Sequence, residues 1–326
     1  MTANLRTEQG REVLRRLLLD ADVVIENFKP GTMEKWGLGP EHIKPHNPQL
    51  IYTRISGYGQ SGPYSSKPGY ASVTEAFSGF RYLNGYPEDV PVRPNLSLGD
   101  SVAGVHAALG ILLALLARKN SRQGQVIDVA LYEAMFNLME GVVPEYDGAG
   151  AVREPAGSTL TGIVPTNTYL CRDGKHVVIG GNGDSIYARL MTAIGREDLA
   201  TDPALGSNAG RVEQQELIDA AIGGWTSAHK SAAVIATLEA VDVPVGPIYS
   251  IADAFNDPHY QARGMFEEVN TPNGKLSIPA ILPKLSLTPG RTNWAGGAVG
   301  SHTDEVLLSA GFDKEALATL RENGDI

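Results

Sequence analysis

The chain has 326 residues, of which 42% are hydrophobic and 20% charged, and its formal net charge is −10 at pH 7. This composition is ordinary for a globular protein with one large or two smaller domains. The negative charge argues against a nucleic acid or a membrane surface as partner. The lone cysteine, Cys171, excludes an intramolecular disulfide. Since the polar N-terminus also lacks a signal-peptide pattern, we expect a cytoplasmic protein.

Helical and strand patterns alternate in the first part of the chain. Apolar residues recur at helical spacing over residues 7–20, and Thr7 is placed to cap that helix. The apolar stretches 22–28 and 49–59 are typical of buried strands, with short helical pieces between them. This order predicts an α/β fold with a parallel sheet.

An apolar run follows, "LGDSVAGVHAALGILLALLARK" at residues 98–119. From Val102 to Leu116 every residue except His106 is apolar or glycine, and these fifteen residues are too few for a membrane span of about 20. We therefore expect a buried core helix over residues 101–118, with His106 as a core residue.

Asp100 precedes this run and has two compatible interpretations. As an N-cap, its carboxylate accepts a backbone N–H of the first turn and opposes the helix dipole. As a catalytic nucleophile, its ionised carboxylate attacks an activated acyl carbon. The preceding glycine, Gly99, leaves space for a substrate beside it.

The second part of the chain begins with a stretch rich in Gly, Pro and Ala at residues 144–165, which predicts a domain boundary. Residues 167–184 read as a hairpin with its turn at 172–174, and helical segments follow to about Val241. Residues 242–250 predict a second boundary.

Most familiar catalytic patterns are absent from the sequence. The seven histidines are scattered, and neither they nor the lone cysteine have metal-ligand spacing. "GGNGDS" at residues 180–185 follows a predicted strand and precedes a predicted helix. Alone it is a weak phosphate-loop signal, and an ordinary strand-to-helix turn is the simpler interpretation.

Several motifs together carry a family resemblance. "ENFKPGTMEKWGLG", "ISGYGQSGPY", "LGDSVAGVHAALGILLALL", "GQVIDVALYEAMFNL" and "VPVGPIYSIADAFNDPHYQARGMF" occur in the order seen in class III CoA-transferases, the CaiB/BaiF family. The resemblance extends over essentially the whole chain. "LGDS" most resembles the formyl-CoA:oxalate CoA-transferases and related dicarboxylate CoA-transferases of this family.

The resemblance assigns a role to each of several residues. It places the catalytic aspartate at Asp100, which attacks an acyl-CoA thioester to give an anhydride and then an aspartyl-CoA thioester. It implies that a mobile loop covers this aspartate. The loop glycines are Gly180, Gly181 and Gly183. CoA-contacting residues are implied at Asn27, Phe28, Lys35, Trp36 and Tyr70.

The family architecture is also implied. We expect a Rossmann-like large domain that begins with residues 1–150, a smaller α+β domain at 160–243, and a segment at 244–326 that returns to the large domain. The family pattern adds an interlocked homodimer, acyl-CoA and carboxylate substrates, and no resident cofactor. Family members carry a further N-terminal segment, which this sequence lacks.

Two alternatives stay open. The related α-methylacyl-CoA racemases resemble "GHDINY" where this chain has "GYASVT" at residues 69–74, so the histidine that serves as a base is missing. The absent N-terminal segment raises the other alternative, a non-catalytic CoA-binding remnant.

Overall fold

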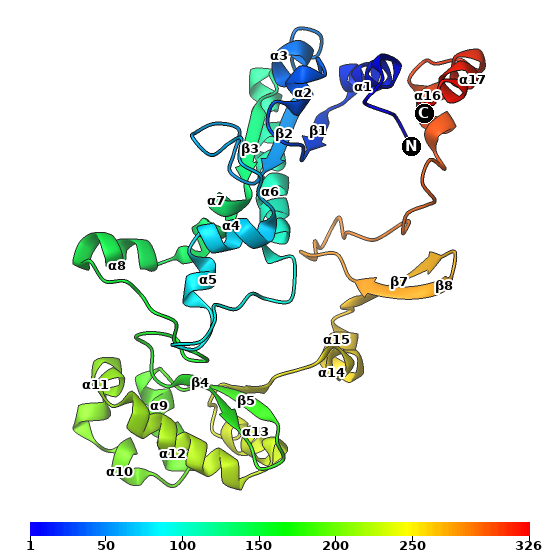
Figure 1. Ribbon diagram of the computed structural model, residues 1–326. Coiled ribbons are helices and arrows are strands. Elements are labelled where there is room, and N and C mark those ends of the chain that lie inside the picture. The colour runs from blue at the N-terminus through cyan, green and yellow to red at the C-terminus, as the bar shows by residue number, and fades with distance from the viewer. The chain divides into compact units, whose positions relative to one another are not determined.

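The computed structural model describes residues 1–326, and the chain divides into two units (Figure 1). Unit 1 contains Met1–Pro155 together with Gly297–Ile326, and unit 2 contains Ala156–Gly296. The assignment of residues 244–326 to the large domain stays a prediction.

A three-stranded parallel sheet organises unit 1. Its order is β1 (Val23–Glu26), β2 (Ile51–Ser56) and β3 (Val126–Ala130). Both pairings are parallel, which confirms the predicted sheet direction. The helices of this unit are α1 (Glu8–Asp20), α2 (Thr32–Lys35), α3 (Pro40–Ile43), α4 (Ala71–Phe77), α5 (Phe80–Leu83), α6 (Leu98–Ser121), α7 (Leu131–Phe136), η1 (Asn137–Met139), α8 (Val142–Ala149), α16 (Thr303–Ser309) and α17 (Lys314–Glu322).

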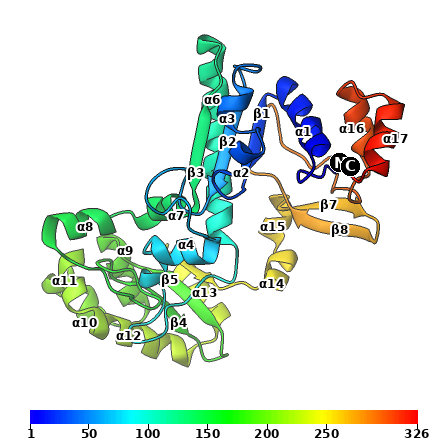
Figure 2. The ribbon, with the colours of Figure 1, turned by 45° about the horizontal axis from the view of Figure 1, so that its top comes forward.

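The two ends of the chain meet within unit 1. Helix α1 begins after Thr7, whose hydroxyl accepts the Gly10 N–H at 3.1 Å, so the predicted cap is confirmed. The buried side chain of Val13 packs in one cluster with residues of α16 and α17. The Asn4 N–H donates to the Asp325 carbonyl at 2.7 Å, and Figure 2 shows the N- and C-termini side by side.

Helix α6 begins earlier than the sequence predicts. It starts at Leu98 rather than at residue 101, and Ser97 occupies the N-cap position. The reason is a long-range contact: the buried Glu75 carboxylate of α4 accepts the Gly99 N–H at 3.1 Å. The prediction that Asp100 caps the helix is therefore wrong, because Asp100 lies inside the first turn.

The prediction that α6 is a buried helix is also wrong for most of its surface. The helix packs on β2, β3, α4 and α7. Its buried residues are Gly99, Ala103, Ala107 and Ala114. These small side chains form the packed face, whereas Leu109, Leu112, Leu113 and Leu116 are 54–60% exposed. By length and hydropathy α6 could cross a membrane, but one such helix is weak evidence, since core helices of soluble proteins pass the same test.

Unit 2 contains a second sheet, and its strands are antiparallel. The predicted hairpin is confirmed as β4 (Thr166–Leu170) and β5 (His176–Gly180), and β6 (Val245–Pro247) pairs with the other edge of β5. A hairpin of β7 (Phe266–Thr271) and β8 (Gly274–Pro279) follows. The helices are α9 (Asp184–Ala193), α10 (Glu197–Ala200), η2 (Pro203–Leu205), α11 (Asn208–Glu213), α12 (Gln215–Ala228), α13 (Ser231–Glu239), α14 (Ile251–Asn256) and α15 (Pro258–Ala262).

Candidate active site

A pocket of about 590 Å³ opens at the carboxyl ends of the parallel strands of unit 1. Residues 27–30 follow β1, residues 55–57 end β2, and Leu131 follows β3. The rest of the lining comes from the 65–72 segment, Arg93 and Asp100. The carboxyl edge is where open parallel sheets place their ligands, because the loops after each strand converge there.

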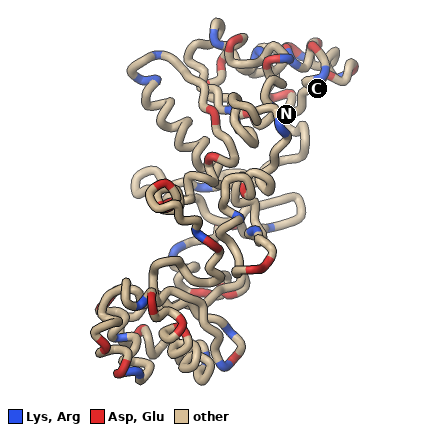
Figure 3. The backbone as a smooth tube through the Cα atoms, turned by 60° about the vertical axis from the view of Figure 1, so that its left-hand side comes forward, with Lys and Arg blue, Asp and Glu red and all other residues tan.

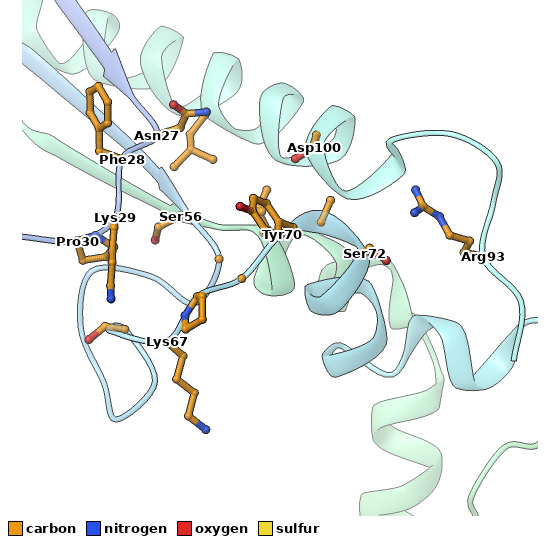
Figure 4. Close-up of a pocket in the computed structure, with 17 residues that line it drawn as sticks. Asn27, Phe28, Lys29, Pro30, Ser56, Lys67, Tyr70, Ser72, Arg93 and Asp100 are labelled. Atoms are coloured by element: carbon orange, nitrogen blue, oxygen red, sulfur yellow. The ribbon is translucent and has the colours of Figure 1, made fainter. Parts of the chain in front are cut away.

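Asp100 is the only acidic residue that lines this pocket. Its side chain is exposed and makes no hydrogen bond or ion pair within the chain. The first turn of α6 therefore presents a free carboxylate to any ligand that enters the pocket (Figure 4). Such a group is available for covalent catalysis.

Gly99 has a different role from the one expected. A Cβ at this position would lie 3.2 Å from the Ala71 Cβ and 3.3 Å from a Glu75 carboxylate oxygen. The missing side chain of Gly99 thus lets α6 pack closely on α4. The sequence analysis did not identify Glu75. The one feature that could have indicated it is that Glu75 is the only charged residue in a helix of apolar and small residues.

Three cations line the same pocket: Lys29, Lys67 and Arg93. None of them has an acidic partner in the chain. The Lys67 ammonium lies 3.4 Å from the centre of the Tyr64 ring. Acidic and basic positions are interspersed along both units (Figure 3), so this cation group is a local feature of a chain whose net charge is −10. The pocket suits a ligand with several negative charges.

The sequence analysis did not identify these cations as site residues, although the sequence position of each offered a clue. Lys29 directly follows the Asn27-Phe28 pair, and Lys67 lies three residues before Tyr70. Arg93 stands between two prolines in a stretch without helical or strand pattern. Since isolated basic residues in loops are usually solvated surface charges, only the folded loops reveal the group.

The structure brings four of the predicted site residues together. Asn27, Phe28, Tyr70 and Asp100 all line the pocket. The predicted Lys35 and Trp36 do not line it. The Trp36 ring contacts the Phe28 ring edge-to-face with centroids 5.2 Å apart, so it supports a residue of the lining.

A buried charge network fixes the loop that carries Asn27 and Phe28. The Arg54 guanidinium of β2 donates to Glu26 at 2.7 Å and to Glu34 of α2 at 2.6 Å. The other Glu26 carboxylate oxygen accepts the Phe28 N–H at 2.7 Å. The hydrogen bond from Arg54 holds the pKa of the Glu34 carboxyl below its usual value. The network ties β1, β2 and α2 to one edge of the pocket.

Ser56, at the end of β2, provides a further polar group. It lines the pocket, and its buried hydroxyl has no hydrogen-bond partner in the chain. No group of three or more His, Cys, Asp or Glu side chains is arranged to hold a metal ion.

The predicted loop glycines lie in unit 2, where Gly180 ends β5 and Gly181 and Gly183 lie between β5 and α9. The fully buried Arg211 of α11 anchors this loop. Its guanidinium donates to the Asn182 carbonyl at 2.7 Å and to the Asp184 carboxylate at 2.8 Å. The predicted covering of Asp100 by this loop stays a prediction.

Replacement of Gly181 by valine is expected to impair folding. A Cβ there would lie 2.6 Å from the Leu190 Cδ2 and 3.1 Å from the Pro165 Cγ, so overpacking should cost about 1–3 kcal/mol. Gly180→Ala is the matched control, because its Cβ meets only Pro244 at 3.9 Å. Urea denaturation of both variants measures the difference, and equal midpoints would contradict it. Gly181→Val is therefore a poor probe of loop closure.

Comparisons with known proteins show which family the chain resembles. A family model described as CoA-transferase family III matches residues 1–303. The chain is 41% identical over 323 residues to the succinyl-CoA–D-citramalate CoA-transferase of Chloroflexus aurantiacus, with 98% of this chain and 80% of that protein covered. It is 33% identical over 317 residues to the succinyl-CoA:mesaconate CoA-transferase of Haloarcula marismortui, with 95% and 79% covered.

A comparison with solved structures supports the same family. The crystal structure of a CaiB/BaiF family protein from Brucella suis matches with a TM-score of 0.82 at 32% identity, covering 95% of this chain and 81% of that one. This confirms the predicted α/β fold class. The chain belongs to CoA-transferase family III, the CaiB/BaiF family, and is a CoA-transferase.

Proposed function

We propose that this enzyme transfers CoA from succinyl-CoA to a second small dicarboxylic acid, with Asp100 as the nucleophile. The observation that carries the proposal is the free Asp100 carboxylate in a pocket where all other charged groups are cations. The relatives support the substrate class, because their names give succinyl-CoA as donor and citramalate, malate or mesaconate as acceptor.

The first half of the reaction loads CoA onto the protein. An oxygen of the Asp100 carboxylate attacks the thioester carbonyl carbon of succinyl-CoA. The C–S bond breaks, which leaves a succinyl–aspartyl anhydride and the CoA thiolate. The thiolate then attacks the aspartyl carbonyl carbon, so that succinate leaves and an aspartyl-CoA thioester remains.

The second half runs the same steps toward the acceptor. A carboxylate of the acceptor acid attacks the aspartyl-CoA carbonyl carbon and expels the CoA thiolate. The thiolate attacks the acceptor's carbonyl in the resulting anhydride, which releases the new acyl-CoA and restores the Asp100 carboxylate. No step needs a net proton transfer, in keeping with a pocket whose charged lining is cationic apart from Asp100.

The pocket residues have separate tasks in this proposal. Lys29 and Lys67 offset the negative charge of the CoA phosphates. The network centred on Arg54 keeps the Phe28 backbone in place. The two lysines also favour the negative charge that develops on the carbonyl oxygen during attack.

Succinyl-CoA incubated with the purified chain and D-citramalate, L-malate or mesaconate is expected to yield a second acyl-CoA and an equal amount of succinate. Liquid chromatography with mass spectrometry measures both products. Hydrolysis to free CoA without transfer would contradict the proposal. So would α-proton exchange of an acyl-CoA in deuterated water without transfer, which would indicate racemase chemistry.

A further inference from the structure

Arg93 lies in the active-site pocket but has no part in the chemical steps above. We infer that Arg93 selects dicarboxylic over monocarboxylic acids by binding the carboxylate that does not react. This inference rests on the proposed function, since it concerns the substrates of the same site. It assigns to Arg93 a contact with the far end of both the donor acyl group and the acceptor acid.

The first argument is the arrangement of charge along the pocket. Figure 4 shows Asp100 between Arg93 on one side and Lys29 and Lys67 on the other. In an acyl-CoA thioester, the CoA moiety and the acyl chain extend from opposite sides of the carbonyl carbon. When that carbon lies at Asp100, CoA on the side of the two lysines leaves the acyl chain on the side of Arg93.

The second argument is that the Arg93 guanidinium is available. It forms no ion pair with any carboxylate of the chain, including Asp100. Its hydrogen bonds run to two carbonyl oxygens of its own loop, Pro94 and Leu96, and both measure 3.3 Å. These contacts are long and leave donors free for a ligand. By contrast, Arg54 and Arg81 are each held by a glutamate.

The third argument is chemical fit. A guanidinium presents a planar fork of N–H donors that matches a carboxylate in a bidentate arrangement, and an ammonium lacks this geometry. Pro91 and Pro94 flank Arg93 closely, and each fixes its own φ near the value set by its ring, which restricts the loop backbone. The side chain is therefore presented from a stiffened stretch of an otherwise irregular segment.

A competition experiment tests this assignment. Wild-type enzyme and Arg93→Gln receive ¹³C-labelled succinyl-CoA with equal unlabelled succinate and butyrate, two acids of the same chain length. The ratio of unlabelled succinyl-CoA to butyryl-CoA reports the ratio of the two kcat/KM values, because both acids compete for the same loaded enzyme. We expect Arg93→Gln to lower this ratio by about 10- to 100-fold, the size of one charge-assisted hydrogen bond.

Two further variants keep the test specific. Lys67→Gln removes the same charge from the opposite side of Asp100, and it should raise the KM for succinyl-CoA while leaving the acid ratio unchanged. Arg93→Lys keeps the charge but loses the fork, and it should lower the ratio by a smaller factor. If Arg93→Gln fails to fold by circular dichroism, Arg93→Lys gives the deciding ratio.

The outcomes separate the two proposals. If the wild type forms no unlabelled acyl-CoA from either acid, the proposed function fails. If the wild type transfers CoA and the ratio is the same in the Arg93 variants, the assignment of Arg93 is overturned. A parallel loss with both acids also leaves the ratio unchanged and overturns it.

Discussion

Asp100→Asn is expected to lower the rate of CoA transfer by roughly 10³-fold or more, because an amide cannot form the acyl anhydride. The same substitution removes a negative charge from the first turn of α6, where it opposes the helix dipole, so the free energy of unfolding should fall by only about 0.3–1 kcal/mol. Initial rates with succinyl-CoA and urea denaturation measure the two effects.

Trapping provides a direct chemical test of the same residue. Hydroxylamine added to wild-type enzyme and succinyl-CoA should convert Asp100 to a hydroxamate, which peptide mass spectrometry locates. Asp147→Asn is the matched control, since Asp147 is exposed on α8 and does not line the pocket. A folded Asp100→Asn enzyme with a rate near that of the control would refute the role of Asp100 as nucleophile.

Arg211→Met is expected to destabilise unit 2 by about 3–5 kcal/mol, because several buried carbonyl oxygens lose their donor and each unpaired acceptor costs about 1–3 kcal/mol. The Arg211 side chain is fully buried, and besides the loop it donates to the Val164 and Leu205 carbonyl oxygens, both at 3.0 Å. Methionine fills similar space but leaves these acceptors unpaired. Thermal and urea denaturation measure the loss.

A surface arginine of the same unit provides the comparison for Arg211. Arg196 forms an ion pair with Asp198 at 2.7 Å, and both side chains are substantially exposed. Arg196→Met should therefore cost at most about 1 kcal/mol. Similar losses for the two variants would show that the buried hydrogen bonds of Arg211 do not anchor the loop at residues 180–184.

Local sequence patterns were sufficient for much of the fold. The capped helix α1, the parallel strands of unit 1 and the β4–β5 hairpin follow from spacing and turn residues close in sequence. The start of α6 could not be predicted in this way, because its first turn is stabilised by Glu75, a residue 24 positions from Gly99. Hydropathy alone also could not show that alanines, rather than leucines, form the packed face.

The candidate active site could be predicted from the sequence to a similar degree. Asn27, Phe28, Tyr70 and Asp100 belong to recognisable motifs, and the structure places them in one pocket. The roles of Lys35 and of the loop glycines stay predictions. The cations of the pocket were missed because their common position depends on how separate loops fold over the sheet edge, which no single stretch of sequence encodes.

The position of Arg93 has a consequence for how such enzymes diversify. Residues 84–97 form neither helix nor strand, whereas Asp100 belongs to a long helix that packs on the sheet. Surface loops tolerate replacement and length changes far better than packed elements do. With the roles proposed for Arg93 and Asp100, exchange of this one segment between relatives should transfer acid preference while the chemistry stays in place, so new substrates could evolve without changes to the helix that carries Asp100.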